Sequence, residues 1–177
     1  GALTYQANFD AMVFFLEAVW PAIRARRPGV VLRITGSTDG VPLHRLPGDG
    51  VIFTGHLRDV RPALARSRVC VVPMQTGGGT RLKILEALAL GTPVVSTRKG
   101  AEGLDVTPGE NILIADEPGE FAAAVLRLLE SPALCARLAV NGQDLVRRHY
   151  NWCQIGEQFD SFLQQVVRQY RHQDTRA

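Results

Sequence analysis

Short apolar segments rich in β-branched residues alternate with longer segments of helical periodicity along most of the chain. This alternation limits the fold, because the apolar segments lack a polar residue at every second position, as is typical of strands that helices cover on both faces. The sequence therefore predicts an α/β fold, with a Rossmann-like, doubly wound parallel sheet followed by C-terminal helices. The expected strands are 30–35, 51–53, 68–72, 93–96 and 111–114.

The helices are predicted from apolar residues spaced three and four positions apart, and from the prolines and glycines that end them. Asn8 is expected to cap the first helix, and Pro28 and Gly29 end it. Residues 1–170 are interpreted as one domain, and residues 171–177 as a polar tail with frayed structure. The expected helices are 8–27, 60–66, 82–90, one that begins at 118, 132–149 and 152–170.

The chain has 177 residues, of which 46% are apolar, so it is long enough to bury a core of its own. Its net charge of +3 is too small to indicate a nucleic acid or an anionic membrane as a partner. No run of about 18 uncharged apolar residues is present, so no transmembrane segment is expected. The chain starts at Gly1 without an initiator methionine or a signal peptide, and is expected to be excised from a longer protein or to carry a tag remnant.

The three cysteines, Cys70, Cys135 and Cys153, are odd in number and far apart, with no C-x-x-C pair. This spacing disfavours a disulfide framework, a redox motif and a zinc ribbon. Cys70 lies in an apolar segment and is interpreted as a small buried hydrophobic residue. A reducing, cytoplasmic location is the expectation. No metal site is expected, and the sequence contains no Asp-x-Asp motif.

The loop after the third expected strand contains three consecutive glycines, Gly77, Gly78 and Gly79, and continues into Arg81 and Lys83. Glycines let backbone N–H groups approach a ligand closely, and the start of the following helix favours an anion such as a phosphate. The spacing is neither that of a P-loop nor that of G-x-G-x-x-G. The loop is therefore interpreted as an anion site, with a flexible turn as the alternative.

Glu86 is the only charged residue in the apolar run from Ile84 to Leu90, so its carboxylate is expected to be partly buried. It could accept hydrogen bonds from sugar hydroxyls on a ligand. A salt bridge to Lys83 or a solvated position on the helix is an equally good interpretation of the spacing.

Two other loops are weaker candidates. His56 follows the second expected strand and could line a pocket, although lone loop histidines are usually surface residues. Residues 98–103 follow the fourth expected strand and could border the same cleft, or form a solvated loop. No Ser-His-Asp order, G-x-S-x-G or H-E-x-x-H is present, which disfavours hydrolases and zinc peptidases.

The segment 78–97, GGTRLKILEALALGTPVVST, resembles the donor-binding signature of GT-B glycosyltransferases. More narrowly, it is similar to that of the retaining, group 1 family of bacterial glycosyltransferases. Residues 1–11, 55–57 and 100–104 also resemble this family, so the resemblance spans nearly the whole chain.

The resemblance implies that residues 1–170 are the C-terminal, donor-binding half of a GT-B fold. The implied ligand is a nucleotide-diphosphate sugar linked to UDP or GDP, with no cofactor beyond this donor substrate. The glycine-rich loop, with Arg81 and Lys83, would face the diphosphate, Glu86 the ribose, and 55–57 the base. The residues assigned to the donor in this way are Gly36, Gly55, His56, Leu57, Gly77, Gly78, Gly79, Thr80, Arg81, Lys83 and Glu86.

Two departures from the family pattern concern the sugar and the charge balance. Gly78 occupies the position of the first glutamate of the family's Glu-x7-Glu motif, which leaves sugar recognition and the catalytic residues unassigned. Thr4, Tyr5 and Gln6 occupy a stretch where relatives commonly carry basic residues.

The acceptor-binding domain of a GT-B enzyme has no counterpart in this chain, so a glycan, lipid or small-molecule acceptor would bind a missing N-terminal domain. The isolated chain is expected to transfer sugar poorly or not at all, and the full protein to be cytoplasmic or peripheral to a membrane. The last helix would leave apolar residues unpartnered and invite self-association, through Ile155, Phe159, Phe162, Val166 and Tyr170. A nucleotide-sugar epimerase and a non-catalytic nucleotide-binding or protein-binding module remain alternatives.

Overall fold

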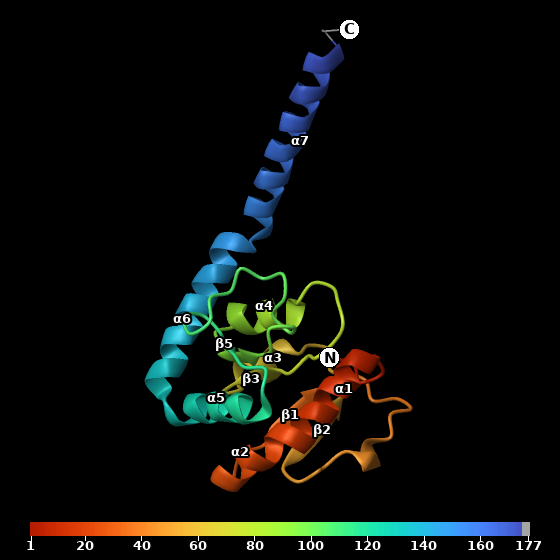
Figure 1. Cartoon of the computed structure of the whole chain (residues 1–177), viewed down its shortest axis with the longest axis vertical. Helices are drawn as coiled ribbons and strands as arrows, with labels where there is room; N and C mark the ends of the chain where they lie inside the picture. Colours follow the sequence, from red (N-terminus) through yellow and green to blue (C-terminus); the bar gives the residue numbers. More distant parts are fainter. Residues whose placement is uncertain (175–177) are drawn as a thin grey trace.

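The structure is a computed structural model that describes residues 1–174, except the side chains of Arg45 and of residues 170–174. It consists of short parallel strands covered by helices, with the last helix extending away from the rest (Figure 1). In chain order the elements are α1 Gln6–Phe14, the π-helical segment η1 Phe15–Val19, α2 Trp20–Arg26, β1 Leu32–Thr35, the 3-10 turn η2 Leu43–Arg45, β2 Val51–Gly55, α3 Arg61–Ala65, β3 Cys70–Val72, α4 Leu82–Ala89, β4 Val94–Ser96, β5 Leu113–Ile114, α5 Pro118–Glu130, α6 Pro132–His149 and α7 Trp152–Asp174.

The strands form two hydrogen-bonded groups of parallel strands. One has the order β1-β2 and the other has the order β3-β4-β5. The predicted α/β class and the parallel strand direction are confirmed. The predicted single sheet, however, is divided within residues 1–174, because no strand pairs with both β1 and β3.

The core is built where the first helical segment packs against α5. Phe15, Leu16, Val19 and Ile23 are almost completely buried, which fixes one face of this segment. The ring of Phe15 meets the ring of Phe121 edge to face, with the ring centroids 5.8 Å apart. Such pairs add to the hydrophobic stabilisation that burial of large rings provides.

A second group of buried apolar residues lies beneath α4. Ile84 and Leu88 of this helix are fully buried, and the group also contains Val72, Val94 and Ile112 from the neighbouring strands and loop. These contacts hold α4 on the sheet and so fix where its amino end lies.

The helix boundaries agree with the prediction except at two ends. Asn8 was expected to cap the first helix, but this prediction is wrong because Tyr5 occupies the N-cap position and Asn8 lies in the first turn. The Asn8 amide instead donates to the carbonyl of Ala2 at 2.8 Å. Helix α7 continues to Asp174, into the expected tail, and residues 175–177 lie outside the described part.

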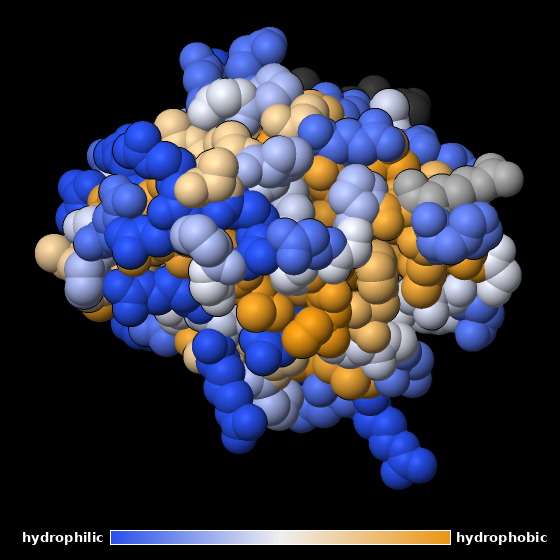
Figure 2. All heavy atoms as spheres, turned by 90° about the horizontal axis from the view of Figure 1, so that it is seen from below, coloured by the Kyte–Doolittle hydropathy of each residue, from blue (hydrophilic) through white to orange (hydrophobic). Residues whose placement is uncertain are grey.

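Helix α7 leaves the body of the molecule, and its large apolar side chains are unpartnered as predicted (Figure 1). Phe159 is 61% exposed, Phe162 59% and Val166 43%, whereas Ile155 is half-buried and Tyr170 lies outside the described side chains. Figure 2 shows a further apolar patch near the middle of the lower face, with hydrophilic residues around it. Within the described residues, no helix combines the length and apolar character needed to cross a membrane.

Candidate functional site

Most of the predicted site residues meet where the parallel strands end, as the fold predicts for a ligand site. An open cavity of about 640 Å³ is bordered there by Gly36, His56, Leu57, Lys83 and Glu86. A smaller hollow of about 200 Å³ lies beside it. Lys83 borders both, so the two spaces form one candidate site. The smaller hollow is lined by Tyr5, Asn8, Val72, Met74, Gly78, Thr80, Arg81, Lys83 and Gly100.

The glycine-rich loop needs glycine at two of its three positions. Gly77 has a φ of +97° and Gly79 a φ of +86°, values that other residues rarely adopt, whereas Gly78 has an ordinary backbone conformation. A Cβ atom on Gly77 would also lie 3.1 Å from the Cβ of Ala7. Gly78 is exposed and has open space around its Cα, so its role is to leave room in the hollow.

The amino end of α4 opens beside this loop. Arg81 occupies its N-cap position, and no side chain forms a capping hydrogen bond there. The Leu82 and Ile84 N–H groups donate to the carbonyl oxygens of Thr80 and Arg81, so the helix dipole and the remaining first-turn N–H of Lys83 are the features that favour a negatively charged ligand. The amino end of α4 therefore lies beside the glycine-rich loop, where the sequence predicts an anion site.

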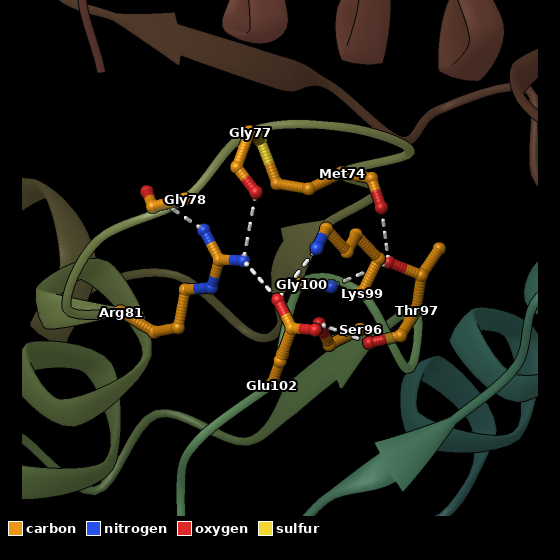
Figure 3. Close-up of polar contacts among 9 residues, drawn as sticks. All are labelled: Met74, Gly77, Gly78, Arg81, Ser96, Thr97, Lys99, Gly100 and Glu102. Carbon is orange, nitrogen blue, oxygen red and sulfur yellow. Dashed lines mark hydrogen bonds and ion pairs between the residues drawn. The ribbon is translucent and has the colours of Figure 1, made fainter.

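Arg81 is buried, with 6% of its side chain exposed, and its guanidinium is turned toward the protein (Figure 3). It donates to the carbonyl oxygens of Gly78 at 3.1 Å and Gly77 at 3.2 Å, and to the Glu102 carboxylate at 3.2 Å. Its Nε is also buried and has no hydrogen-bond partner. Arg81 thus braces the glycine-rich loop from the protein side.

Glu102 connects Arg81 to a second basic residue, Lys99, whose Nζ donates to the same carboxylate oxygen at 2.6 Å (Figure 3). The Lys99 ammonium, followed by Arg81, holds the pKa of Glu102 below its ordinary value. The loop 98–103, a weaker candidate from the sequence, therefore borders the site through Glu102 and Gly100.

Lys83 reaches back to the first helix. Its Nζ donates to the Asn8 side-chain carbonyl at 2.8 Å and lies 3.6 Å from the sulfur of Met74. Burial lowers the pKa of the Lys83 ammonium, and the nearby Arg81 charge acts in the same direction. Since no carboxylate neutralises Lys83 among the described contacts, its charge is available to an anion in the hollow.

Glu86 differs from the expectation of a partly buried carboxylate. Its side chain is exposed, because it lies on the edge of α4 away from the buried face of Ile84, Ala87 and Leu88. It forms no ion pair with Lys83 among the described residues, so the predicted alternative of a salt bridge between the two is also wrong. The carboxylate instead borders the larger cavity, with His56 exposed at the same opening.

Gly36 and Gly55 lie side by side at the ends of β1 and β2. The Gly36 N–H donates to the Gly55 carbonyl at 2.9 Å. A Cβ atom on Gly36, which has a φ of +124°, would lie 2.4 Å from the carbonyl carbon of Gly1. Gly36 therefore permits the close approach of Gly1, and Gly55 has a φ of +68° that lets the chain turn after β2.

Tyr5 and Asn8 also line the site, although no sequence pattern predicted them there. Both come from the start of α1, and they reach the hollow only because α1 packs against the glycine-rich loop. The hydrogen bond between Lys83 and Asn8 joins residues that are 75 positions apart in the sequence. No local sequence pattern predicts a contact over such a separation. Residues 1–174 contain no cluster of three or more potential metal ligands among His, Cys, Asp and Glu.

Comparison with known proteins defines the class of protein to which this fold and site belong. The family of group 1 glycosyl transferases matches residues 1–131. The chain therefore belongs to the group 1 glycosyltransferases, and the resemblance inferred from segment 78–97 is confirmed at the level of the family. The epimerase alternative is not favoured by this result.

Two curated proteins that are similar to this chain are named as glycosyl-transferring enzymes. One is a GDP-mannose-dependent phosphatidylinositol monomannoside mannosyltransferase from Corynebacterium glutamicum, 29% identical over 84% of this chain and 42% of that protein. Another is the lipopolysaccharide core biosynthesis glycosyltransferase LpsE from Rhizobium meliloti, 36% identical over 68% of this chain and 37% of that protein. The chain spans less than half the length of these relatives.

Solved structures confirm the GT-B type of fold. Anabaena Alr3699/HepE, in complex with UDP, superposes with a TM-score of 0.77 at 21% identity, covering 93% of this chain and 47% of that one. Sucrose-phosphate synthase from Thermosynechococcus elongatus gives 0.73 at 26% identity, covering 94% and 44%.

Proposed function

We propose that residues 1–170 are the C-terminal, donor-binding domain of a retaining GT-B glycosyltransferase, and that the donor is a nucleotide-diphosphate sugar. The observation that carries this proposal is the convergence of an uncapped helix start, a glycine-rich loop and Lys83 on one hollow. A relative named as GDP-mannose-dependent and neighbours solved with UDP or UDP-glucose support a nucleotide-linked donor without fixing the base.

In this proposal the diphosphate lies against Gly78, Gly79 and Thr80, at the amino end of α4. Lys83 supplies a full positive charge, and Arg81 holds the loop in place through its hydrogen bonds to the Gly77 and Gly78 carbonyl oxygens. Glu86 accepts from the ribose hydroxyls, and the base lies near 55–57 at the larger cavity, with Gly36 at its edge.

These groups would accelerate transfer by stabilising the leaving nucleoside diphosphate. As the bond between the anomeric carbon and the phosphate oxygen breaks, negative charge grows on the diphosphate. Donors that already point at that position stabilise this charge without reorganisation. The cations and helix end supply the positive charge that the leaving group requires, and the catalytic residues and the acceptor site would lie on a second domain.

The isolated chain is therefore expected to bind the donor and to transfer sugar poorly or not at all. A glycan, lipid or small molecule would be the acceptor for the full protein, which would be cytoplasmic or peripheral to a membrane. The exposed residues Phe159, Phe162 and Val166 of α7 would contact that second domain, and in its absence a second copy.

The proposal is tested by calorimetric titration of UDP, GDP, UDP-glucose and GDP-mannose into the chain. We expect saturable binding of at least one of them, weakened by Lys83→Met and by Glu86→Ala. Unchanged affinity in both variants would refute the residue assignments, and a full-length protein that cleaves the donor without glycosylating an acceptor would refute transferase function.

A further inference from the structure

The glycine-rich loop has no backbone hydrogen bonds that hold its first part in place. Within residues 1–174, residues 74–79 take part in no hydrogen bond between backbone groups. Gly77 and Gly79 have positive φ values, and all of residues 75–80 except Gly77 are exposed. Glycine-rich segments lose much conformational freedom when they become ordered. The conformation that a ligand meets must therefore be fixed by side chains from other parts of the molecule.

Arg81 fixes the later part of this loop. Its guanidinium donates to the carbonyl oxygens of Gly77 and Gly78, and the Glu102 carboxylate accepts from the same guanidinium (Figure 3). These contacts reach back to Gly77 and no further. The residue at which the loop leaves β3, Met74, therefore needs a separate partner.

Thr97 is that partner. Its hydroxyl donates to the Met74 carbonyl oxygen and accepts from the Gly100 N–H at 2.9 Å (Figure 3). A hydroxyl carries one donor and two acceptor lone pairs, so it can form both bonds at once. The residue is buried, and its own N–H donates to the Val72 carbonyl at 3.3 Å. Thr97 thus ties the start of the glycine-rich loop to the turn after β4.

The turn 97–100 is a firm support for this tie, because it packs directly against the end of β3. A Cβ atom on Gly100 would lie 2.4 Å from the Ser96 hydroxyl oxygen and 2.7 Å from the Val72 carbonyl oxygen. Ser96 is fully buried, and its hydroxyl lies 3.1 Å from the same Val72 oxygen. Such close packing leaves the turn little room to shift. Gly100 also borders the smaller hollow, so the turn and the loop line one space.

We propose that Thr97 is a positioning residue of the donor site. Its hydroxyl fixes where the glycine-rich loop begins, as Arg81 fixes where it ends. Thr97 is buried and acts through Met74, which lines the hollow. Order that is already present in the free protein does not have to be imposed when the ligand binds, and this raises affinity. The inference rests on the proposed function, because the ligand that reports on the loop is a nucleoside diphosphate.

Three substitutions separate the hydroxyl of Thr97 from its shape. Thr97→Val keeps the branched shape and removes both hydrogen bonds, whereas Thr97→Ser keeps the hydroxyl and loses a methyl group. Thr92→Val is the matched control. Thr92 is also buried, and its hydroxyl donates to the Leu64 carbonyl at 2.9 Å, beyond the carboxyl end of α4. All three leave the charge of the site unchanged, which a substitution of Glu102 would not.

Calorimetric titration of UDP and GDP into these variants tests the role in binding. We expect Thr97→Val to weaken the affinity about threefold to tenfold, and Thr97→Ser to stay close to the unsubstituted chain. Thr92→Val should lower Tm without changing the affinity, because its hydrogen bond lies away from the loop.

NMR of the free proteins tests the role in order without any ligand. The order parameters of the 75–80 amides should fall in Thr97→Val and not in Thr97→Ser or Thr92→Val. The Gly100 amide, which loses its acceptor, should exchange faster in Thr97→Val alone.

Unchanged affinity or unchanged order parameters in Thr97→Val would overturn the proposal while leaving the proposed function standing. A loss of affinity in Thr92→Val as large as that in Thr97→Val would also overturn it, because the effect would then be one of general stability. If Thr97→Val does not fold, Thr97→Ala compared with Thr97→Ser gives the same contrast. The absence of UDP and GDP binding in the unsubstituted chain would refute the proposed function, and with it the role of Thr97 in binding.

Discussion

Lys83 on α4 and Asn8 on α1 are joined by a 2.8 Å hydrogen bond between the Lys83 Nζ and the Asn8 side-chain oxygen. This contact holds the ammonium beside the glycine-rich loop and connects two segments far apart in the chain. It also leaves Lys83 without a carboxylate partner among the described residues. The hollow therefore has a cation that a phosphate can use.

Replacement of Lys83 by methionine should weaken binding of UDP or GDP strongly. A hydrogen bond to a charged group contributes about 1.5–3 kcal/mol, which corresponds to a loss of about tenfold or more in affinity. Asn8→Ala should reduce affinity less, because it only releases the ammonium from its position. Calorimetry checks both, and a larger loss in Asn8→Ala than in Lys83→Met would contradict this ranking.

The lowered pKa of Lys83 should make stability depend on pH in a definite direction. Because the folded pKa lies below the unfolded value, the unfolded chain binds more protons between the two values. Lys83 should therefore raise the free energy of unfolding with pH across that interval, up to its ordinary pKa of 10.5. The Cys70 thiol, whose pKa burial raises to about 11, opposes this rise above its ordinary value of 9.0, so the Lys83 contribution is the difference between the unmodified chain and Lys83→Met. Urea unfolding at several pH values checks this.

Lys83→Met is the control for that experiment, and it should flatten the rise. The pKa of the Gly1 ammonium is also lowered. It therefore adds a second rise of the free energy of unfolding with pH, which ends near the ordinary pKa of this group, 8.0. Acetylation of Gly1 should remove that contribution alone. A pH dependence that neither Lys83→Met nor acetylation of Gly1 changes would contradict the assignment of both groups.

Gly36→Ala should destabilise the fold more than Gly40→Ala. Both glycines have positive φ values, +124° and +70°, but only a Cβ on Gly36 would meet other atoms, those of Gly1 and Ala2 at 2.4–2.6 Å. For Gly40, in the left-handed helical region, the conformational cost is about 1–2 kcal/mol. Gly36→Ala should add about 1–3 kcal/mol for displacing the backbone at Gly1. Equal losses in urea unfolding would show that Gly1 moves aside freely.

Arg81→Met should destabilise the loop as well as the ligand complex. It removes the donors to the Gly77 and Gly78 carbonyl oxygens, and about 1–3 kcal/mol of stability should be lost. Glu102→Gln is the matched change on the other side of the ion pair. It should cost less, because Glu102 is largely exposed. Thermal unfolding checks the order of the two variants.

Sequence periodicity was sufficient for most of the fold. The apolar strands and the amphipathic helices depend on local patterns, and they occur within a few residues of where these patterns place them. The division between β1 and β3 could not be predicted, because which strands pair depends on contacts across the whole chain. Capping at Tyr5 rather than Asn8 has the same cause, since Asn8 is recruited by Lys83 and the carbonyl of Ala2.

The candidate site shows the same division between local and long-range information. The glycine-rich loop and Lys83 were recognisable because glycines, a cation and a helix start coincide in sequence. The orientation of the Arg81 side chain toward Glu102 could not be recognised from the sequence. Glu102 lies 21 positions away, and its position depends on the loop after β4. The exposure of Glu86 depends on which face of α4 is buried, a choice that an almost wholly apolar helix leaves open.

The central claim is that the hollow at the amino end of α4 binds the diphosphate of a nucleotide-linked sugar. Calorimetric titration of UDP and GDP into the chain, with Lys83→Met as a matched variant, tests it most directly. The account predicts saturable binding that Lys83→Met weakens by about tenfold or more. The absence of binding of either nucleotide at millimolar concentration, or binding that Lys83→Met leaves unchanged, would contradict it.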